Sequence, residues 1–148
     1  MGRLTQLALA AIATLAISSC ASMEDVLREK EEGGGTTVAY NVSFEEAWEI
    51  SRVVFRWEGC DQIEEHKLQR YMLTTSGGNA VSSGAVMGAW IEPIDDENQS
   101  VTVITKRKVA TNLATTLTEG TFHETCQQAV DIVNSGETLP LTKPRADG

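Results

Sequence analysis

The spacing of apolar residues in the N-terminal half of the chain predicts a strand followed by a helix. Val38, Tyr40 and Val42 alternate with small or polar residues, which is typical of a strand with one buried face. From Phe44 to Trp57 the apolar residues recur at intervals of three and four, which predicts an amphipathic helix. A second segment with helical spacing extends from Thr121 to Val133.

Residues that favour helix ends flank both helical segments. A serine or threonine followed three positions later by glutamate forms a capping box, in which each side chain binds the other residue's backbone amide. A glycine directly after a helix readily adopts the left-handed conformation that ends it. The capping pairs are Ser43 with Glu46 and Thr121 with Glu124, and the glycines are Gly59 and Gly136.

The segments between the two helices have the short apolar patterns of strands. The glycine-rich stretch Ser76–Gly84 has no apolar periodicity and is predicted to be a loop, and the acidic stretch Asp95–Gln99 is predicted to be a hairpin turn. The pattern does not define a structure for residues 111–120. The predicted strands are Cys60–Glu65, Arg70–Thr75, Val86–Ile94 and Ser100–Ala110.

These elements follow the order β-α-β-β-β-β-α and predict an α+β fold. Each helix has one apolar stripe, so we expect a two-layer sandwich in which both helices cover one face of a mostly antiparallel, four- to five-stranded sheet. The folded domain would span residues 36–135. Pro140 and Pro144 disfavour continuation of the last helix, and residues 136–148 are predicted to be a disordered tail.

The chain begins with the features of a secretory signal. Arg3 provides a positive charge, and the apolar run Leu7–Ile17 is too short for a helix that spans about 30 Å of hydrocarbon. The stretch Ile17-Ser18-Ser19-Cys20 resembles the lipobox of bacterial lipoproteins. That resemblance implies a signal peptide over residues 1–19 and a lipidated Cys20. An ordinary cleaved signal beside an incidental cysteine is the alternative.

Location and charge together limit the partners of such a protein. Two or more acyl chains, palmitate among them, anchor a protein stably to a membrane. Ala21 after the cysteine resembles the sorting signal that favours the outer membrane in Gram-negative bacteria, with the domain facing the periplasm. The formal net charge is −9, which argues against nucleic acid and against anionic lipid as partners, because both favour patches of lysine and arginine.

Residues 20–35 would connect the anchor to the domain. This segment is highly charged and could form a short helix with a thin apolar stripe of Met23, Val26 and Leu27. Gly33–Gly35 would then break the helix and add flexibility. We expect a solvated spacer that holds the domain off the membrane, and a partner-binding helix is the alternative.

Three stretches of the domain resemble a family of small uncharacterised bacterial lipoproteins. They are Tyr40–Trp48, Ile63–Lys67 and Thr102–Lys108. The resemblance covers about residues 36–135 and implies a domain that opens with a strand and a capped, tryptophan-bearing helix and continues as a meander of strands. Its motifs are structural, so the resemblance implies a fold and a location but no active site.

Two cysteines lie in the predicted domain. Cys60 follows the first helix, and Cys126 lies on the apolar stripe of the second. If the two helices run antiparallel on one sheet face, these residues lie at the same end of the helical layer. Because the periplasm permits oxidation, we predict a disulfide between Cys60 and Cys126. Two buried thiols are the alternative.

No candidate for chemistry has a complete set of residues. A zinc site needs three or four ligands. His66 lies beside Glu64 and Glu65, but adjacent strand residues point to opposite faces, so we expect these to be solvated turn residues. His123 and Cys126 share a helix face and could bind a metal or form an activated thiolate, but Cys126 lies in the apolar stripe, which favours a structural cysteine. The acidic turn lacks the spacing of a calcium loop, the glycine-rich loop lacks a phosphate-loop ending, and Ser82 and Ser83 lack a nucleophile motif.

The sequence therefore predicts a membrane-anchored, non-catalytic envelope protein with a structural or binding role. We expect no cofactor and no metal. The anchored membrane and an envelope protein are the expected partners. We expect Lys106–Lys108 to be a solvated strand end, and contact with lipid headgroups is the alternative. A small-ligand or peptide-binding domain, with a pocket beside Trp90, is one alternative. A hydrolase that uses serine and histidine is another.

Overall fold

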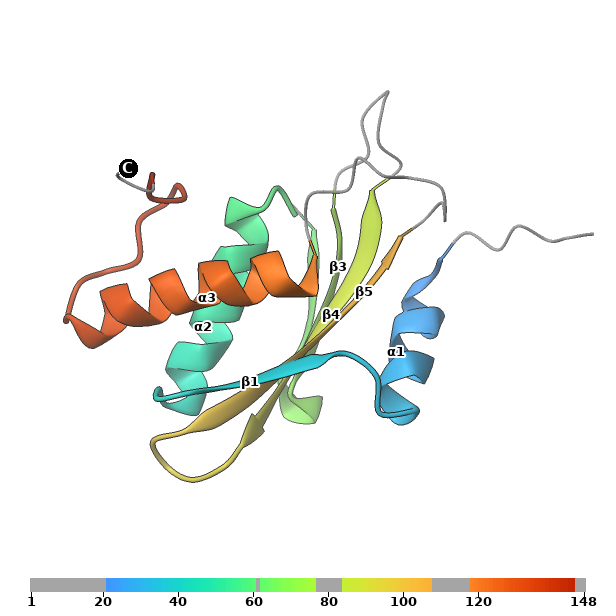
Figure 1. The fold of residues 1–148 in the computed structure, drawn as a ribbon, viewed down its shortest axis with the longest axis horizontal. Coiled ribbons are helices and arrows are strands. Elements are labelled where there is room, and N and C mark those ends of the chain that lie inside the picture. The colour runs from blue at the N-terminus through green and yellow to red at the C-terminus, as the bar shows by residue number, and fades with distance from the viewer. Residues whose placement is uncertain (1–20, 61, 77–83, 108–117, 146–148) are drawn as a thin grey trace, which may run out of the picture.

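Five antiparallel strands and three helices make up the fold, which confirms the predicted α+β class (Figure 1). The computed structural model describes residues 21–60, 62–76, 84–107 and 118–145. The numbers of strands and helices apply to these residues. The strands lie in the order β1-β5-β4-β3-β2. The helices are α1 (Met23–Glu31), α2 (Phe44–Trp57) and α3 (Glu119–Asn134). The strands are β1 (Thr36–Tyr40), β2 (Ile63–His66), β3 (Tyr71–Thr75), β4 (Ala85–Pro93) and β5 (Gln99–Arg107), with the 3-10 turn η1 (Lys67–Gln69) after β2.

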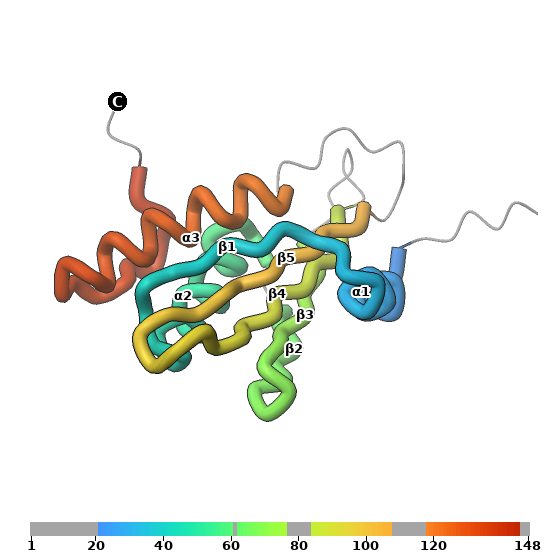
Figure 2. Tube along the Cα trace, turned by 60° about the horizontal axis from the view of Figure 1, so that its bottom comes forward, coloured from blue at the N-terminus to red at the C-terminus, as the bar shows by residue number. Residues whose placement is uncertain are grey.

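Helices α2 and α3 pack together on one face of the sheet, as the sequence predicts (Figures 1 and 2). The ring centroids of Phe55 and Phe122 lie 4.8 Å apart between the two helices. The hydroxyl of Thr125 donates to a carboxylate oxygen of Glu58 at 2.9 Å. The C-terminal end of α2 therefore lies against the N-terminal half of α3.

The predicted capping box is confirmed at α2 and replaced at α3. At α2 the Ser43 hydroxyl accepts from the amide of Glu46, and the Glu46 carboxylate accepts from the amide of Ser43 at 2.8 Å. At α3 the capping residue is Thr118, whose hydroxyl accepts from the amide of Thr121 at 3.1 Å. The box predicted from Thr121 and Glu124 is wrong, because the helix begins two residues before Thr121.

Helix α1 packs on the opposite face of the sheet and adds a third layer. Val26 of α1 is fully buried. Met23 and Leu27 pack, partly buried, against the same apolar cluster, whose sheet residues are Leu73, Val86, Trp90 and Ile104. The interpretation of residues 20–35 as a solvated spacer is therefore wrong for α1. A capping box between Ser22 and Asp25 starts the helix, and this serine–aspartate spacing was an overlooked signal.

The three glycines after α1 form a tight, specific turn. The amide of Gly34 donates to the carbonyl of Glu29 at 2.9 Å, and the amide of Gly33 donates to the carbonyl of Lys30 at 3.1 Å, which is the pattern of a Schellman cap. Gly35 has a φ of 94°, and a Cβ there would lie 2.7 Å from the carbonyl oxygen of Val103. The turn thus leads α1 directly into β1, so these glycines have a structural role.

Strand β4 is the middle strand of the sheet and contributes to the apolar clusters on both of its faces. Its inner face contributes Met87, Ala89 and Ile91 to the core under α2 and α3. Its outer face contributes Val86 and Trp90 to the cluster under α1. The uninterrupted apolar run Ala85–Ile91 is typical of a strand buried on both faces, and it is the sequence signal for the third layer.

We predict that Gly88→Ala destabilises the protein by about 1–3 kcal/mol through overpacking. A Cβ at Gly88 would lie 2.6 Å from the ring of Trp90 and 2.9 Å from Cγ1 of Val26. Urea unfolding measures the loss. Gly120→Ala is the matched control, because its Cβ would lie 3.8 Å from the hydroxyl oxygen of Thr118, an ordinary van der Waals distance, and alanine favours a helix. Equal stability of Gly88→Ala and wild type would contradict the contact between α1 and β4.

Candidate functional site

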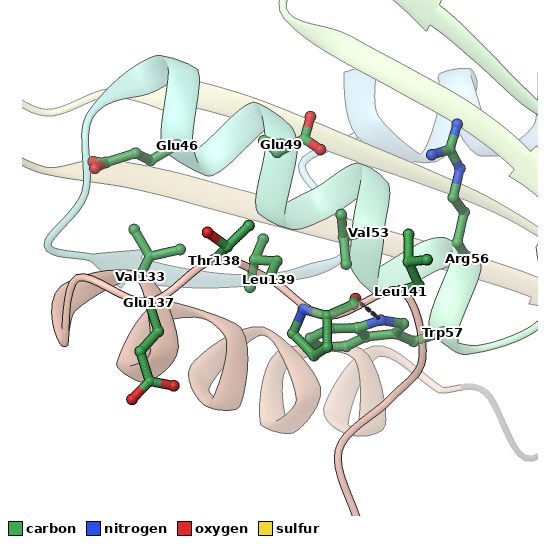
Figure 3. A pocket seen from close by; sticks show the side chains of 11 residues that line it. Glu46, Glu49, Val53, Arg56, Trp57, Val133, Glu137, Thr138, Leu139 and Leu141 are labelled. Carbon is green, nitrogen blue, oxygen red and sulfur yellow. Dashed lines mark hydrogen bonds between the residues drawn. The ribbon is translucent and has the colours of Figure 1, made fainter.

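A groove lies between α2 and the chain that follows α3 (Figure 3). We call it the C-terminal groove, and its volume is about 320 Å³. Figure 3 shows Thr138 and Leu139 in the middle of the groove, Glu46 and Glu137 at one end, and Arg56 and Trp57 at the other. The lining residues are Glu46, Glu49, Val53, Arg56, Trp57, Val133, Glu137, Thr138, Leu139, Pro140 and Leu141.

The apolar lining comes from three elements. Val53 and Trp57 project from α2, Val133 projects from α3, and Leu139 packs from the C-terminal segment against the core. The indole nitrogen of Trp57 donates to the carbonyl oxygen of Pro140 at 3.1 Å, which fixes the ring beside the segment. The groove therefore presents partly buried apolar side chains whose positions are held by packing.

The C-terminal segment, residues 137–145, is ordered along α2 and α3. Lys143 forms an ion pair with Glu58, and Glu58 also accepts from Thr125, so the segment is attached to both helices. Gly136 has a φ of 81° and ends α3, as the sequence predicts. The predicted disorder of residues 136–148 is wrong for this segment, because the apolar Leu139 packs against the core beside the Trp57–Pro140 bond.

Carboxylates outnumber cations around the C-terminal groove. Its lining includes Glu46, Glu49 and Glu137 but one arginine, Arg56. Glu46 accepts from the capped amide of Ser43 and Glu49 pairs with Arg52, so both carboxylates are held in place. Arg52 offsets the charge of Glu49, so the negative charge of the rim comes from Glu46 and Glu137. An apolar surface with such a rim suits an apolar ligand that also carries a positive charge.

His123 is part of a buried hydrogen-bond network. Its Nε2 lies 2.9 Å from the carbonyl oxygen of Thr36, and its Nδ1 lies 2.7 Å from the hydroxyl oxygen of Tyr40. A carbonyl can only accept, so Nε2 carries the proton in the neutral ring and the Tyr40 hydroxyl donates to Nδ1. Both ring nitrogens are engaged, and burial lowers the pKa of His123. The arrangement fixes α3 to β1.

The structure does not contain the predicted disulfide between Cys60 and Cys126, although both residues are described and buried in one core cluster. The helix ends meet as the prediction required. Burial, however, raises the pKa of the Cys126 thiol. The thiolate needed for disulfide exchange is therefore disfavoured, and an activated nucleophile is not formed here.

The other candidate residues occupy structural positions. His66 pairs with Glu64 and stacks on Tyr71 with ring centroids 4.5 Å apart, whereas Glu65 accepts from the indole of Trp48. Asp95 closes the β4–β5 turn, where the amide of Glu97 lowers the pKa of its carboxyl group. Among the described residues, no group of three or more His, Cys, Asp or Glu residues could hold a metal ion.

Helix α1 occupies two places that the sequence left open for ligand or lipid contact, and some other candidate residues lie outside the described part of the chain. Val26 of α1 packs in the same apolar cluster as Trp90 and occupies the place of the ligand pocket that the alternative function requires. Lys106 pairs with Glu29 of α1 at 2.6 Å. Lys108 lies outside the described residues, as do Ser82 and Ser83 and most of the glycine-rich loop.

Comparisons with known proteins give no family for the chain. No family model matches it, and no curated protein is similar enough to count as a match. In the part of the chain that the structure describes, no helix has the length and apolar composition to cross a membrane.

We predict that protonation of His123 destabilises the fold as the pH falls below about 6.5. Burial lowers the pKa of His123 in the folded protein, so the unfolded chain binds more protons below the ordinary value. Stability therefore decreases with decreasing pH, by at most about 1.4 kcal/mol per unit, until the folded pKa is reached. Urea unfolding between pH 5.5 and 7.5 measures this slope.

The comparison is made in a His66→Gln background, which leaves His123 as the single histidine. Adding His123→Gln should flatten the slope, because glutamine can still donate to the carbonyl of Thr36 but does not titrate. Equal slopes for the two variants would contradict the buried neutral histidine.

Proposed function

We propose that this protein is a lipid-anchored, non-catalytic binding module of the bacterial cell envelope. The lipobox-like stretch Ile17-Ser18-Ser19-Cys20 after an apolar run supports the anchor. Ala21 supports attachment to the outer membrane with the domain in the periplasm. The C-terminal groove is the single observation that carries the binding role.

The groove favours an apolar peptide segment with a basic residue as ligand. Val53, Trp57 and Leu139 give it apolar contact surface, and its carboxylates outnumber Arg56. Its volume of about 320 Å³ suits a few side chains. Leu141 is fully exposed at the groove and offers a further apolar contact without the need to displace a packed residue.

A binding role agrees better with the described side chains than a hydrolase does. A hydrolase requires a nucleophile in reach of a base that is itself oriented by a third group. His123 uses both ring nitrogens within the fold, and the lining of the groove contains neither histidine nor cysteine. The partly buried His66 pairs with Glu64 on the edge strand β2, away from the groove.

We predict that a clickable fatty acid labels the wild-type protein in bacterial cells and that Cys20→Ala abolishes the labelling. The thiol of Cys20 is the acyl acceptor in this proposal. Ser19→Ala is the matched control, because it keeps a small residue at the cleavage position and should keep the label. Equal labelling of wild type and Cys20→Ala would rule out the anchor.

We predict that a benzophenone amino acid at Leu141 crosslinks to a discrete envelope partner in intact cells. The same residue at Leu68 is the matched control, because Leu68 is also an exposed leucine, at 94%, but lies in η1 outside the groove. Val53→Arg should abolish the adduct at Leu141, because it adds bulk and positive charge to the groove. An adduct that is equal at both positions, or unchanged by Val53→Arg, would contradict binding in the groove.

A further inference from the structure

The docking of α1 leaves very little chain between the proposed anchor and the folded domain. Cys20 precedes Met23, the first residue of α1, by three positions, and three extended residues span at most about 11 Å. If residues 21–35 were an extended spacer, they would span about 50 Å instead. The anchor would therefore hold the start of α1 close to the membrane surface.

Contacts along α1 fix its direction relative to the sheet. Near its start, Cγ1 of Val26 lies against the backbone of Gly88 in β4. Near its end, Lys30 pairs with Glu92 at 3.1 Å, four residues further along β4. These two contacts advance along β4 in the direction of the chain. The Glu29–Lys106 pair shows that α1 also reaches β5 opposite Val86, near the start of β4, and Figure 1 shows the first turn of α1 at that end of the sheet.

The ribbon in Figure 1 agrees with this direction. Figure 1 shows the start of α1 on the same side as the end of β5, whereas the β4–β5 hairpin lies at the far end of the sheet. β4 contains nine residues, so its two ends are separated by about 30 Å. The hairpin is therefore well separated from the anchored end.

We propose that the end of the sheet formed by the start of β4 and the end of β5 faces the phospholipid surface, and that the β4–β5 hairpin points into the periplasm. This inference rests on the proposed lipid anchor. The short connection and the docked α1 carry it. The C-terminal groove, on the other face of the sheet from α1, then stays open to the periplasm.

Charge supports the same orientation. The hairpin carries Asp95, Asp96 and Glu97, all of them exposed, and anionic lipid repels such a cluster. At the opposite end, β5 finishes with the exposed Arg107, which anionic headgroups attract, and the first turn of α1 adds the exposed Glu24, so the described residues of this end carry fewer unpaired carboxylates than the hairpin. Turning the hairpin toward the bilayer would therefore be unfavourable even for a tethered domain that can tilt.

Energy transfer to headgroup-labelled lipid tests this orientation in the full-length lipoprotein. The protein is reconstituted in vesicles that contain phosphatidylglycerol and an acceptor-labelled lipid. A donor fluorophore is attached to a cysteine introduced at Arg107 or at Asp96, and the parent protein gives the background labelling of buried thiols. We expect several-fold higher transfer from position 107 than from position 96.

Two variants separate the contribution of α1 from that of the anchor. A flexible glycine–serine insertion between Ala21 and Ser22 should remove most of the difference between the two positions. Val26→Asp should do the same, because a buried charge undocks α1. Equal transfer from both positions in vesicle-bound protein would overturn the orientation and leave the anchor intact. A protein that does not bind vesicles at all would overturn the anchor and the orientation together.

Discussion

The burial of β4 on both faces is the constraint on which the rest of the fold depends. A strand in the middle of the sheet with apolar residues on each side requires a covering layer on each side. Helices α2 and α3 supply one layer, and α1 supplies the other with a single fully buried side chain, Val26. Gly88 makes this thin layer possible, because the Trp90 ring and Val26 occupy the space that a side chain there would fill.

This constraint links the N-terminal segment to the domain. A charged stretch that only had to connect an anchor to a fold could be extended and solvated, but Trp90 and Ile104 would then be exposed on the outer face. The pairs Glu29–Lys106 and Lys30–Glu92 add directional contacts to the apolar docking. They are partly exposed, so the burial of Val26 contributes more to the position of α1 than the ion pairs do.

Local signals in the sequence predicted most elements well, and non-local contacts account for the failures. The bounds of α2 follow from its capping box and apolar spacing, because both are local. The disorder predicted for residues 136–148 ignored Leu139, whose packing site forms only after α2 and α3 have come together. The disulfide prediction placed the helix ends correctly but could not foresee how deeply the assembled core buries Cys126, which disfavours its thiolate.

The candidate site could not be predicted for the same physical reason. Trp57 and Pro140 are 83 positions apart, and their hydrogen bond closes one end of the groove. Neither residue belongs to a motif, and Trp57 alone resembles the last apolar residue of an amphipathic helix. The groove and α1 nevertheless lie on opposite faces of the sheet, with β4 between them. A ligand in the groove would contact α2 and the C-terminal segment without competing for the residues that hold α1, so the proposed binding and the proposed anchoring are compatible in one small domain.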